Sequence, residues 1–262
     1  MDIENLRSVP VNPDTEAGFY EYIGDNFAEY FFFHVDYAQY PESTEIYMAL
    51  DKNDSIHGML LIWEDRRIQL RGSVKSLEVL LRDKNYIPKS ITGFDKHKAI
   101  IAKYFPQYTK EIALYRMAMR KGDFVDFENY PFKVLLDSDK EHIASFMRIT
   151  DPIYWGSRKP EDIMIDENNV FFGIFNNSNK LISITGFWKY KNVGYITIVG
   201  THPDYRNKGY ASSLVSSTIK NLFQEKSECF ITVRVKNPPA IHTYEKLGFI
   251  IQNTQYSYEK DL

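Results

Sequence analysis

The segment from Gly194 to Phe223 constrains the fold of this 262-residue chain more than any other stretch. Residues 195–199 are β-branched or aromatic, which favours a strand, and Pro203 cannot donate a hydrogen bond to a sheet, so the strand should end near 201–203. From residue 211 onward, apolar side chains recur at the spacing of one helix face. They are Ala211, Leu214, Val215, Ile219 and Leu222. The segment therefore predicts a strand and an amphipathic helix joined by a short loop.

The loop between this strand and this helix has the residue types of an anion site. It contains Arg206, Asn207, Lys208 and Gly209. A helix start presents free main-chain N–H groups and the positive end of the helix dipole, and a glycine allows a ligand to approach the backbone closely. Two flanking cations add attraction. The loop therefore predicts a cradle for phosphate groups.

A second motif, from Asn237 to Phe249, reads NPPAIHTYEKLGF. It follows an apolar strand predicted at 230–235, and its helix at 240–247 carries Tyr244. Gly248 stands where a left-handed residue commonly ends a helix. Taken alone, the segment is equally compatible with an ordinary strand–helix–strand unit.

Together, the run Arg206-x-x-Gly209-x-Ala211 and the segment 237–249 resemble, in order and spacing, the two signatures of the GNAT N-acetyltransferase superfamily. The resemblance covers residues 132–258, about half of the chain. It implies an α/β (α+β) fold in which a mixed, mostly antiparallel sheet is flanked by helices. It also implies transfer of an acyl group from acyl-CoA to an amine.

The resemblance further implies where acetyl-CoA is held. The pyrophosphate contacts the loop made of Arg206, Asn207, Lys208, Gly209, Tyr210 and Ala211. The strand end at Val199, Gly200 and Thr201 splays from its neighbour and pairs with the pantetheine arm, and an N–H of Val199 or Gly200 polarises the thioester carbonyl. Asn237 helps to place the pantetheine or Tyr244. Tyr244 matches the general acid of the family, although a tyrosine that only packs its ring is the alternative.

The acceptor side, again by resemblance, is formed by the first helix of the second half and the loop after it. Tyr154, Trp155 and Arg158 are the candidates for acceptor contact, with Arg158 suited to a carboxylate. The alternative is that this loop packs its aromatic residues against the first half of the chain.

The general base is not fixed by the sequence. Many relatives carry a glutamate on the strand before the pyrophosphate loop, whereas residues 193–199 contain no carboxylate. Asp166, Glu167, His202 and His242 stay open as candidates. Proton loss through water is the default interpretation.

The first half is predicted to be a separate αβ domain. The polar, turn-rich segment 120–131 favours a boundary, which gives domains at 1–125 and 126–262. A hairpin, a third strand and a helix around Trp63 repeat the order found around Trp188. Either the fold is duplicated and the first copy is degenerate, or the likeness is chance. Arg71-Gly72-Ser73 lacks the phosphate-loop pattern, so no CoA is expected there.

Composition excludes several other classes. The net charge is −3 and no basic stripe is present, which argues against nucleic-acid binding. Cys229 is the single cysteine and the histidines lack zinc spacing, so neither a disulfide nor a metal site is expected. No apolar run reaches the length of a membrane span, and the first residues do not read as a signal peptide. We expect a cytoplasmic protein without a membrane partner.

The sequence thus predicts an acetyl-CoA-dependent N-acetyltransferase that acts on a primary amine of a small molecule or a peptide. Two alternatives stay open. One is an acyl-CoA-binding module without catalysis, which the missing strand glutamate favours. The other is an enzyme similar to glycine N-acyltransferases that uses a longer acyl group. The acceptor and the oligomeric state are not predicted.

Overall fold

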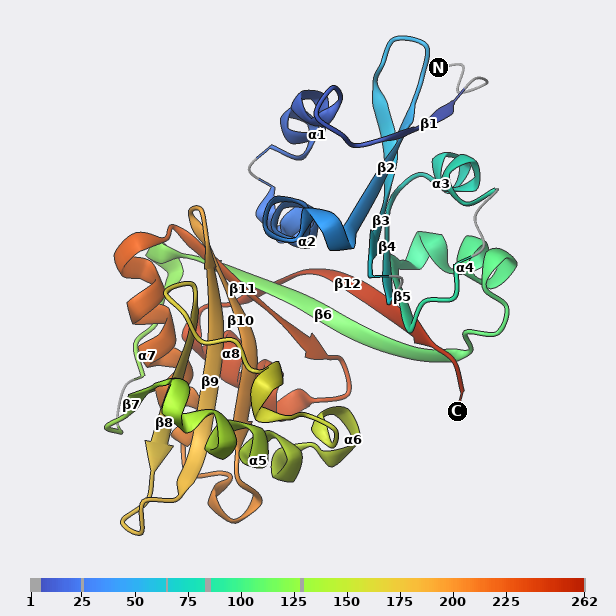
Figure 1. The fold of residues 1–262 in the computed structure, drawn as a ribbon. Coiled ribbons are helices and arrows are strands. Elements are labelled where there is room, and N and C mark those ends of the chain that lie inside the picture. Colours follow the sequence, from blue (N-terminus) through green and yellow to red (C-terminus); the bar gives the residue numbers. More distant parts are fainter. Residues whose placement is uncertain (1–5, 25, 65, 83–85, 128–129, 262) are drawn as a thin grey trace. The chain divides into compact units, whose positions relative to one another are not determined.

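The computed structural model describes residues 6–24, 26–64, 66–82, 86–127 and 130–261 (Figure 1). The chain divides into two compact units. Unit 1 comprises Met1–Tyr115 and Asn253–Leu262, and unit 2 comprises Arg116–Gln252. Each unit has its own strands and its own helices.

Unit 1 is built on strands that follow one another along the chain. They are β1 (Arg7–Pro10), β2 (Thr44–Leu50), β3 (Ile56–Trp63), β4 (Arg67–Gly72) and β5 (Ser90–Phe94). Its helices are α1 (Glu16–Ile23), α2 (Phe27–Gln39), α3 (Val74–Leu81) and α4 (Lys98–Tyr104). Strands β1 to β4 pair antiparallel in sequence order, and β4 pairs parallel with β5.

Helices cover both faces of the unit 1 sheet. Successive side chains of a strand point to opposite faces. On β3, Met59 belongs to a buried cluster with side chains of α1 and α2, whereas the next residue, Leu60, belongs to a cluster with side chains of α3 and α4. The first two helices therefore lie on one face and the last two on the other.

Unit 2 repeats this order of elements. Its strands are β7 (Lys133–Leu135), β8 (Asn169–Phe175), β9 (Leu181–Tyr190), β10 (Val193–Thr201) and β11 (Glu228–Arg234). Its helices are α5 (Lys140–Thr150), α6 (Pro152–Trp155), α7 (Tyr210–Glu225) and α8 (Pro238–Leu247). Strands β7 to β10 pair antiparallel in order, and β10 pairs parallel with β11.

The faces of the unit 2 sheet are covered in the same way. Ile184 of β9 packs in a buried cluster with α5. The hydroxyl of the next residue, Thr185, lies 2.7 Å from that of Thr218 on α7. The shared strand order and the shared helix placement confirm the predicted fold class, including a first domain of the same topology as the second.

Two strands, β6 (Lys110–Arg120) and β12 (Ile250–Glu259), are divided between the units. The division in β6 falls between Tyr115 and Arg116, upstream of the polar segment in which the sequence places its boundary. There is no turn at the division because β6 is one continuous strand. The end of β12 pairs antiparallel with β5, from Gln255 opposite Phe94 to Glu259 opposite Ser90. The end of β12 therefore belongs to unit 1, beside β5.

Three local expectations need correction. The sequence suggests one helix over residues 16–37, but Gly24, with φ 48°, ends α1, and the side chain of Asn26 caps α2. The residues up to about Pro13, which the sequence suggests are a polar leader, contain β1, which pairs with β2. The loop 151–159 contains the short helix α6, and the helix expected at 161–165 is only a 3₁₀ turn, Pro160–Asp162.

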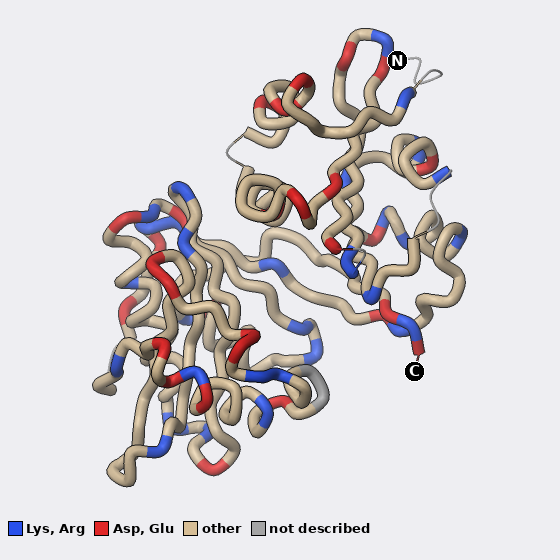
Figure 2. The backbone as a smooth tube through the Cα atoms, in the orientation of Figure 1, with Lys and Arg blue, Asp and Glu red and all other residues tan. Residues whose placement is uncertain are grey.

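Charged residues of both signs are interspersed along each unit (Figure 2). None of the helices in the described part of the chain is long and apolar enough to cross a membrane.

Candidate active site

A cavity of about 550 Å³ in unit 2 lies beside the ends of β10 and β11. Among the described residues, β10 pairs with β11 only from Val193 to Ile196, and its register against β9 is irregular between Ile196 and Ile198. Such a bulge bends a strand away from its regular path. The final residues of β10 are thereby left to line the cavity instead of continuing the parallel ladder.

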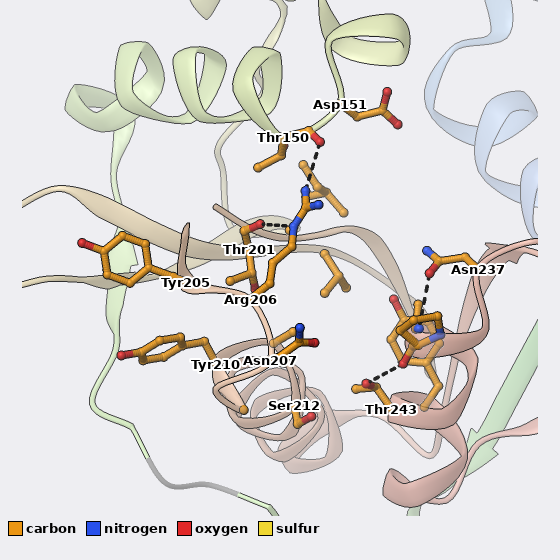
Figure 3. A pocket seen from close by; sticks show the side chains of 18 of the residues that line it. Thr150, Asp151, Thr201, Tyr205, Arg206, Asn207, Tyr210, Ser212, Asn237 and Thr243 are labelled. Atoms are coloured by element: carbon orange, nitrogen blue, oxygen red, sulfur yellow. Dashed lines mark hydrogen bonds between the residues drawn. The ribbon is translucent and has the colours of Figure 1, made fainter. Parts of the chain in front are cut away.

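The cavity collects most of the residues that the sequence selects. Those lining it are Val199, Gly200, Thr201, Arg206, Asn207, Gly209, Tyr210, Ala211, Asn237, Tyr244 and Trp155. Figure 3 shows Tyr205 and Tyr210 towards one end, Asn237 and Thr243 towards the other, and Arg206 between them. Lys208 and Arg158 are not among the lining residues.

The loop from Arg206 to Ala211 presents its backbone to this cavity. Asn207 and Gly209 have positive φ values of 61° and 83°, so the chain turns sharply twice before α7 begins. Within the described residues, the main-chain N–H groups from Asn207 to Ser212 have no hydrogen-bond acceptor in the protein. A row of free N–H groups at the positive end of a 16-residue helix fits an anionic ligand such as a pyrophosphate.

Arg206 lines the cavity and also forms hydrogen bonds that connect the loop to neighbouring elements. Its Nε donates to the carbonyl of Thr201 at 3.1 Å, and its Nη2 donates to the carbonyl of Thr150 at 3.5 Å. The side chain therefore connects the loop to the end of β10 and to the end of α5, and it places a cation at the centre of the cavity (Figure 3).

Gly200 lies where the backbone must come close to α5. A Cβ at this position would stand 3.0 Å from the ring of Phe146, tighter than ordinary contact. Ser183 donates a hydrogen bond to the Gly200 carbonyl at 3.0 Å, which holds this end of β10 in place. The backbone of Val199 and Gly200 is accordingly fixed at the wall of the cavity.

Tyr244 reaches the cavity from α8 and is almost wholly buried, with 5% of its surface exposed. Its ring packs edge-on against Phe249 at 5.9 Å between centroids. Burial raises the pKa of the Tyr244 phenol well above its usual value. The hydroxyl therefore keeps its proton at neutral pH and is available as a donor.

The ends of α8 explain the rest of the second motif. The Asn237 side chain accepts a hydrogen bond from the N–H of Ala240 at 3.4 Å and caps the helix. Gly248, with φ 107°, ends it. Asn237 therefore has a structural task, and it also lines the cavity.

The three residues predicted to contact the acceptor differ in where they lie. Trp155 lines the cavity. The guanidinium of Arg158 lies 4.8 Å from the Trp155 ring and donates to the carbonyl of Asp162, so it supports Trp155 from outside the lining. The Tyr154 side chain lies outside the described residues.

Asp151, Thr150 and Tyr205 line the cavity but were not selected from the sequence. Asp151 is the one carboxylate in the described lining, and it ends α5. It pairs with Arg234 at 3.7 Å. An aspartate after a helix is too common a pattern to be recognised as a site residue without the fold.

The four residues that the sequence leaves open as general bases lie outside the described lining of the cavity. Asp166 accepts main-chain hydrogen bonds from Asn168 and Asn169 in an exposed turn, and Glu167 and His242 are exposed. The ring of His202 is buried, with its Nε2 at 3.1 Å from Lys180 Nζ. None of the four is among the described lining residues.

The matching position in unit 1 is closed by His97, which precedes α4 as Asn237 precedes α8. His97 is fully buried; its Nε2 donates to the carbonyl of Gly72 at 3.0 Å and its Nδ1 accepts from the N–H of Phe94. Burial lowers the pKa of His97 to about 4, so the ring is neutral. Ser73 caps α3 directly after β4, which leaves no loop there.

One known protein family matches the part of the chain that contains this cavity. The family model of the GNAT acetyltransferases matches residues 136–249, and this part of the chain is a GNAT domain. An N-alpha-acetyltransferase of Saccharolobus solfataricus is 30% identical over 125 residues, which cover 47% of this chain and 66% of that protein. The chain thus spans a little under two thirds of that relative.

Solved structures resemble the fold over nearly the whole chain. An acetyltransferase of the GNAT family from Colwellia psychrerythraea is 10% identical with a TM-score of 0.62, covering 98% of this chain and 100% of the other. A tandem GNAT protein from the clavulanic acid biosynthesis pathway is 12% identical with a TM-score of 0.60, covering 98% and 99%. The tandem neighbour agrees with two units of one topology.

Proposed function

We propose that the protein is an acetyl-CoA-dependent N-acetyltransferase that acetylates a primary amine of a small molecule or a peptide. The observation that carries this proposal is one cavity lined by the phosphate-type loop, the end of β10 and the buried phenol of Tyr244. The relatives are N-acetyltransferases by name, which supports the same class of reaction.

The residues fit the parts of an acyl-CoA. The free N–H groups from Asn207 to Ser212 and the cation of Arg206 hold the pyrophosphate. The backbone of Val199 and Gly200 meets the pantetheine arm and the thioester oxygen. When bound, acetyl-CoA supplies an activated acetyl group. Neither the Lys208 side chain nor Arg158 is needed in this assignment.

The reaction then needs three proton movements. Asp151 attracts the acceptor ammonium, which loses its first proton to solvent and becomes a nucleophile. As the amine nitrogen bonds to the carbonyl carbon, the carbon–sulfur bond breaks and the nitrogen loses a second proton to solvent. Tyr244 donates its proton to the departing sulfur and is reprotonated from solvent. The products are an amide and CoA with a free thiol.

The direct experiment combines binding and turnover. Calorimetry with CoA is expected to give one site per chain, and thiol release from acetyl-CoA should require an amine from a panel of amino acids, polyamines and peptides with free N-termini. Tight CoA binding without transfer to any member would support the non-catalytic module instead. Faster transfer from longer acyl-CoA esters would support the glycine N-acyltransferase-like alternative. A protein that binds no CoA would contradict all three.

The compartment stays a prediction. Cys229, the single cysteine, is fully buried and free, which is compatible with the cytoplasmic location expected from the sequence.

A further inference from the structure

The segment that precedes β7 lies along α7, and we name its described residues, 124–127 and 130, the strap. The N–H of Phe127 donates to the Ser216 hydroxyl at 2.8 Å, and the N–H of Tyr130 donates to the Ser213 hydroxyl at 3.0 Å. The two serines are one helical turn apart and fully buried. The strap is therefore fixed to α7 by hydrogen bonds that small polar residues on one helix face make possible.

The end of the strap contacts the phosphate-type loop. The Tyr130 hydroxyl donates to the carbonyl oxygen of Lys208 at 2.8 Å, and the Tyr130 ring lies 4.4 Å from the ring of Tyr210. A Cβ built on Gly209 would meet the rings of Phe127 and Tyr130 at 3.7 and 3.8 Å. The strap thus packs against the loop, and neither Phe127 nor Tyr130 is among the described residues that line the cavity.

The bond to Lys208 has a consequence for the neighbouring N–H. In a planar trans peptide, the C=O and the following N–H point in opposite directions. Tyr130 holds the Lys208 carbonyl on the strap side, so the N–H of Gly209 points away from the strap, and Gly209 is one of the residues that line the cavity. If this peptide flipped, a carbonyl oxygen would face the ligand phosphates and repel them.

The peptide orientation needs to be fixed because Gly209 gives this part of the loop conformational freedom. Its φ of 83°, next to the φ of 61° at Asn207, belongs to a backbone region in which glycine has few steric restraints. A loop that combines a glycine with an exposed end can adopt several peptide orientations. An external hydrogen bond selects one of them before the ligand arrives, which lowers the entropy lost on binding.

We infer that Tyr130 is a positioning residue for the acyl-CoA pyrophosphate: its hydroxyl fixes the Lys208–Gly209 peptide with the N–H towards the ligand. The inference rests on the proposed function. It differs from a packing role because it depends on the hydroxyl oxygen and not on the ring.

The test is Tyr130→Phe, which keeps the ring against Tyr210 and removes only the hydrogen bond. The expected result is a rise of about 5- to 10-fold in the Kd for CoA and in the KM for acetyl-CoA, the effect of one lost hydrogen bond. The kcat and the KM for the amine should change less than about twofold, since the bond acts on binding. With S-acetylpantetheine, which lacks the pyrophosphate, variant and wild type should have equal kcat/KM.

Tyr195→Phe is the matched control. It removes a hydroxyl that lies 3.2 Å from the Thr232 hydroxyl in the same unit, and Tyr195 is not among the described lining residues. This variant should bind CoA as the wild type does. Equal affinity of wild type and Tyr130→Phe would overturn the inference alone, as would an equal loss with S-acetylpantetheine. A wild type that binds no CoA would overturn the proposed function and the inference with it.

Discussion

At the scale of single residues, the chemistry proposed here depends on a phenol that burial keeps protonated. Tyr244 is expected to donate to the departing sulfur, so Tyr244→Phe should lower kcat about 100-fold, the smaller end of general-acid effects. The KM for acetyl-CoA should stay nearly constant because the ring is retained. Initial rates of thiol release at saturating acetyl-CoA measure this. Unchanged turnover with a good acceptor would remove the acid role.

Asp151 is a second residue with a testable role. Its side chain is 36% exposed and pairs with Arg234, so an acceptor ammonium can take the place of that partner. Asp151→Asn should raise the KM for the amine about tenfold and leave the Kd for CoA unchanged. Asp137→Asn removes an exposed carboxylate that pairs with Lys140 and serves as control. Equal amine kinetics in the two variants would exclude Asp151 from acceptor binding.

Asp36 in unit 1 gives a pH-dependent prediction. It is 2% exposed, and burial raises its pKa to about 6 although Arg67 acts in the opposite direction. A carboxyl whose folded-state pKa is raised above the unfolded value of about 3.9 makes the fold less stable as pH rises from about 4 to 6. Neutral His97, with its lowered pKa, has the opposite slope between about pH 6.5 and 4.

The two slopes are separated by comparing Asp36→Asn with the wild type. The difference in unfolding free energy between them should move by about 2 kcal/mol in favour of the variant from pH 4 to pH 7, since the pKa shift is about two units and the unfolded carboxyl is already half ionised at pH 4. Urea unfolding at both pH values measures this, with exposed Asp14→Asn as control. A difference that is constant with pH would contradict the raised pKa.

Some residues of the site were predicted from the sequence and others were not. Asn237 was selected through the family resemblance, and Gly248 was predictable because a left-handed glycine at a helix end is a local feature with its own pattern. Asp151 and Tyr130 were not, because their contacts join segments far apart in the chain. The Tyr130 hydroxyl meets a carbonyl 78 positions away, and no local pattern encodes such a bond.

At the scale of elements, the loop before α7 depends on backbone conformation more than on charge. Gly209→Ala places a side chain in a left-handed conformation, which costs about 1–2 kcal/mol, although space for the Cβ exists. We expect lower thermal stability and weaker CoA binding. Gly18→Ala is the control, because Gly18 lies inside α1 with nothing within 4 Å of its Cβ position.

The control should change stability in the opposite direction. Alanine within a helix is favoured over glycine by about 0.5–1 kcal/mol, so Gly18→Ala should raise the melting temperature and leave CoA binding unchanged. Calorimetric scans and CoA titrations of both variants provide the comparison. A Gly209→Ala protein as stable and as tight-binding as the wild type would contradict the conformational requirement.

Helices and strands were predicted best where the hydrophobic period of a segment and the turn residues at its ends indicated the same element. Strand β10 and helix α7 fit their predicted segments because their strand and helix patterns end at clear turn signals. The single helix predicted over residues 16–37 was wrong because its apolar spacing continues across Gly24. Periodicity alone does not detect a break at which φ becomes positive.

At the scale of the whole molecule, the sequence indicates two halves but not that residues 253–262 belong to the first of them. Each half reads as hairpin, third strand, helix, strand, helix and final strand, and this order is local. Which sheet a final strand joins is decided by pairing, and β12 carries no pattern that distinguishes its two ends. Gln255–Glu259 pairs with β5 of unit 1, and the paired residues nearest in sequence, Phe94 and Gln255, are 255 − 94 = 161 positions apart.

This pairing predicts an asymmetric effect of removing residues 253–262. Unit 1 would lose the neighbour of β5, the buried Tyr258 ring and its hydrogen bond to Glu111. An unpaired strand edge and an open core should destabilise unit 1 and favour aggregation. Unit 2 keeps the whole cavity, since every described lining residue lies between Thr150 and Tyr244.

Hydrogen exchange with and without CoA measures both halves of this prediction. In the truncated protein, amides of β2 to β5 should exchange faster by at least tenfold, while those of β9 and β10 should stay protected and gain protection on CoA binding. A variant with Glu259→Gln, which removes only the ion pair to Lys110, controls for loss of charge and should resemble the wild type. Equal loss of protection in both units would mean that they do not fold as separate bodies, whereas full protection of β5 would mean that β12 contributes little to unit 1.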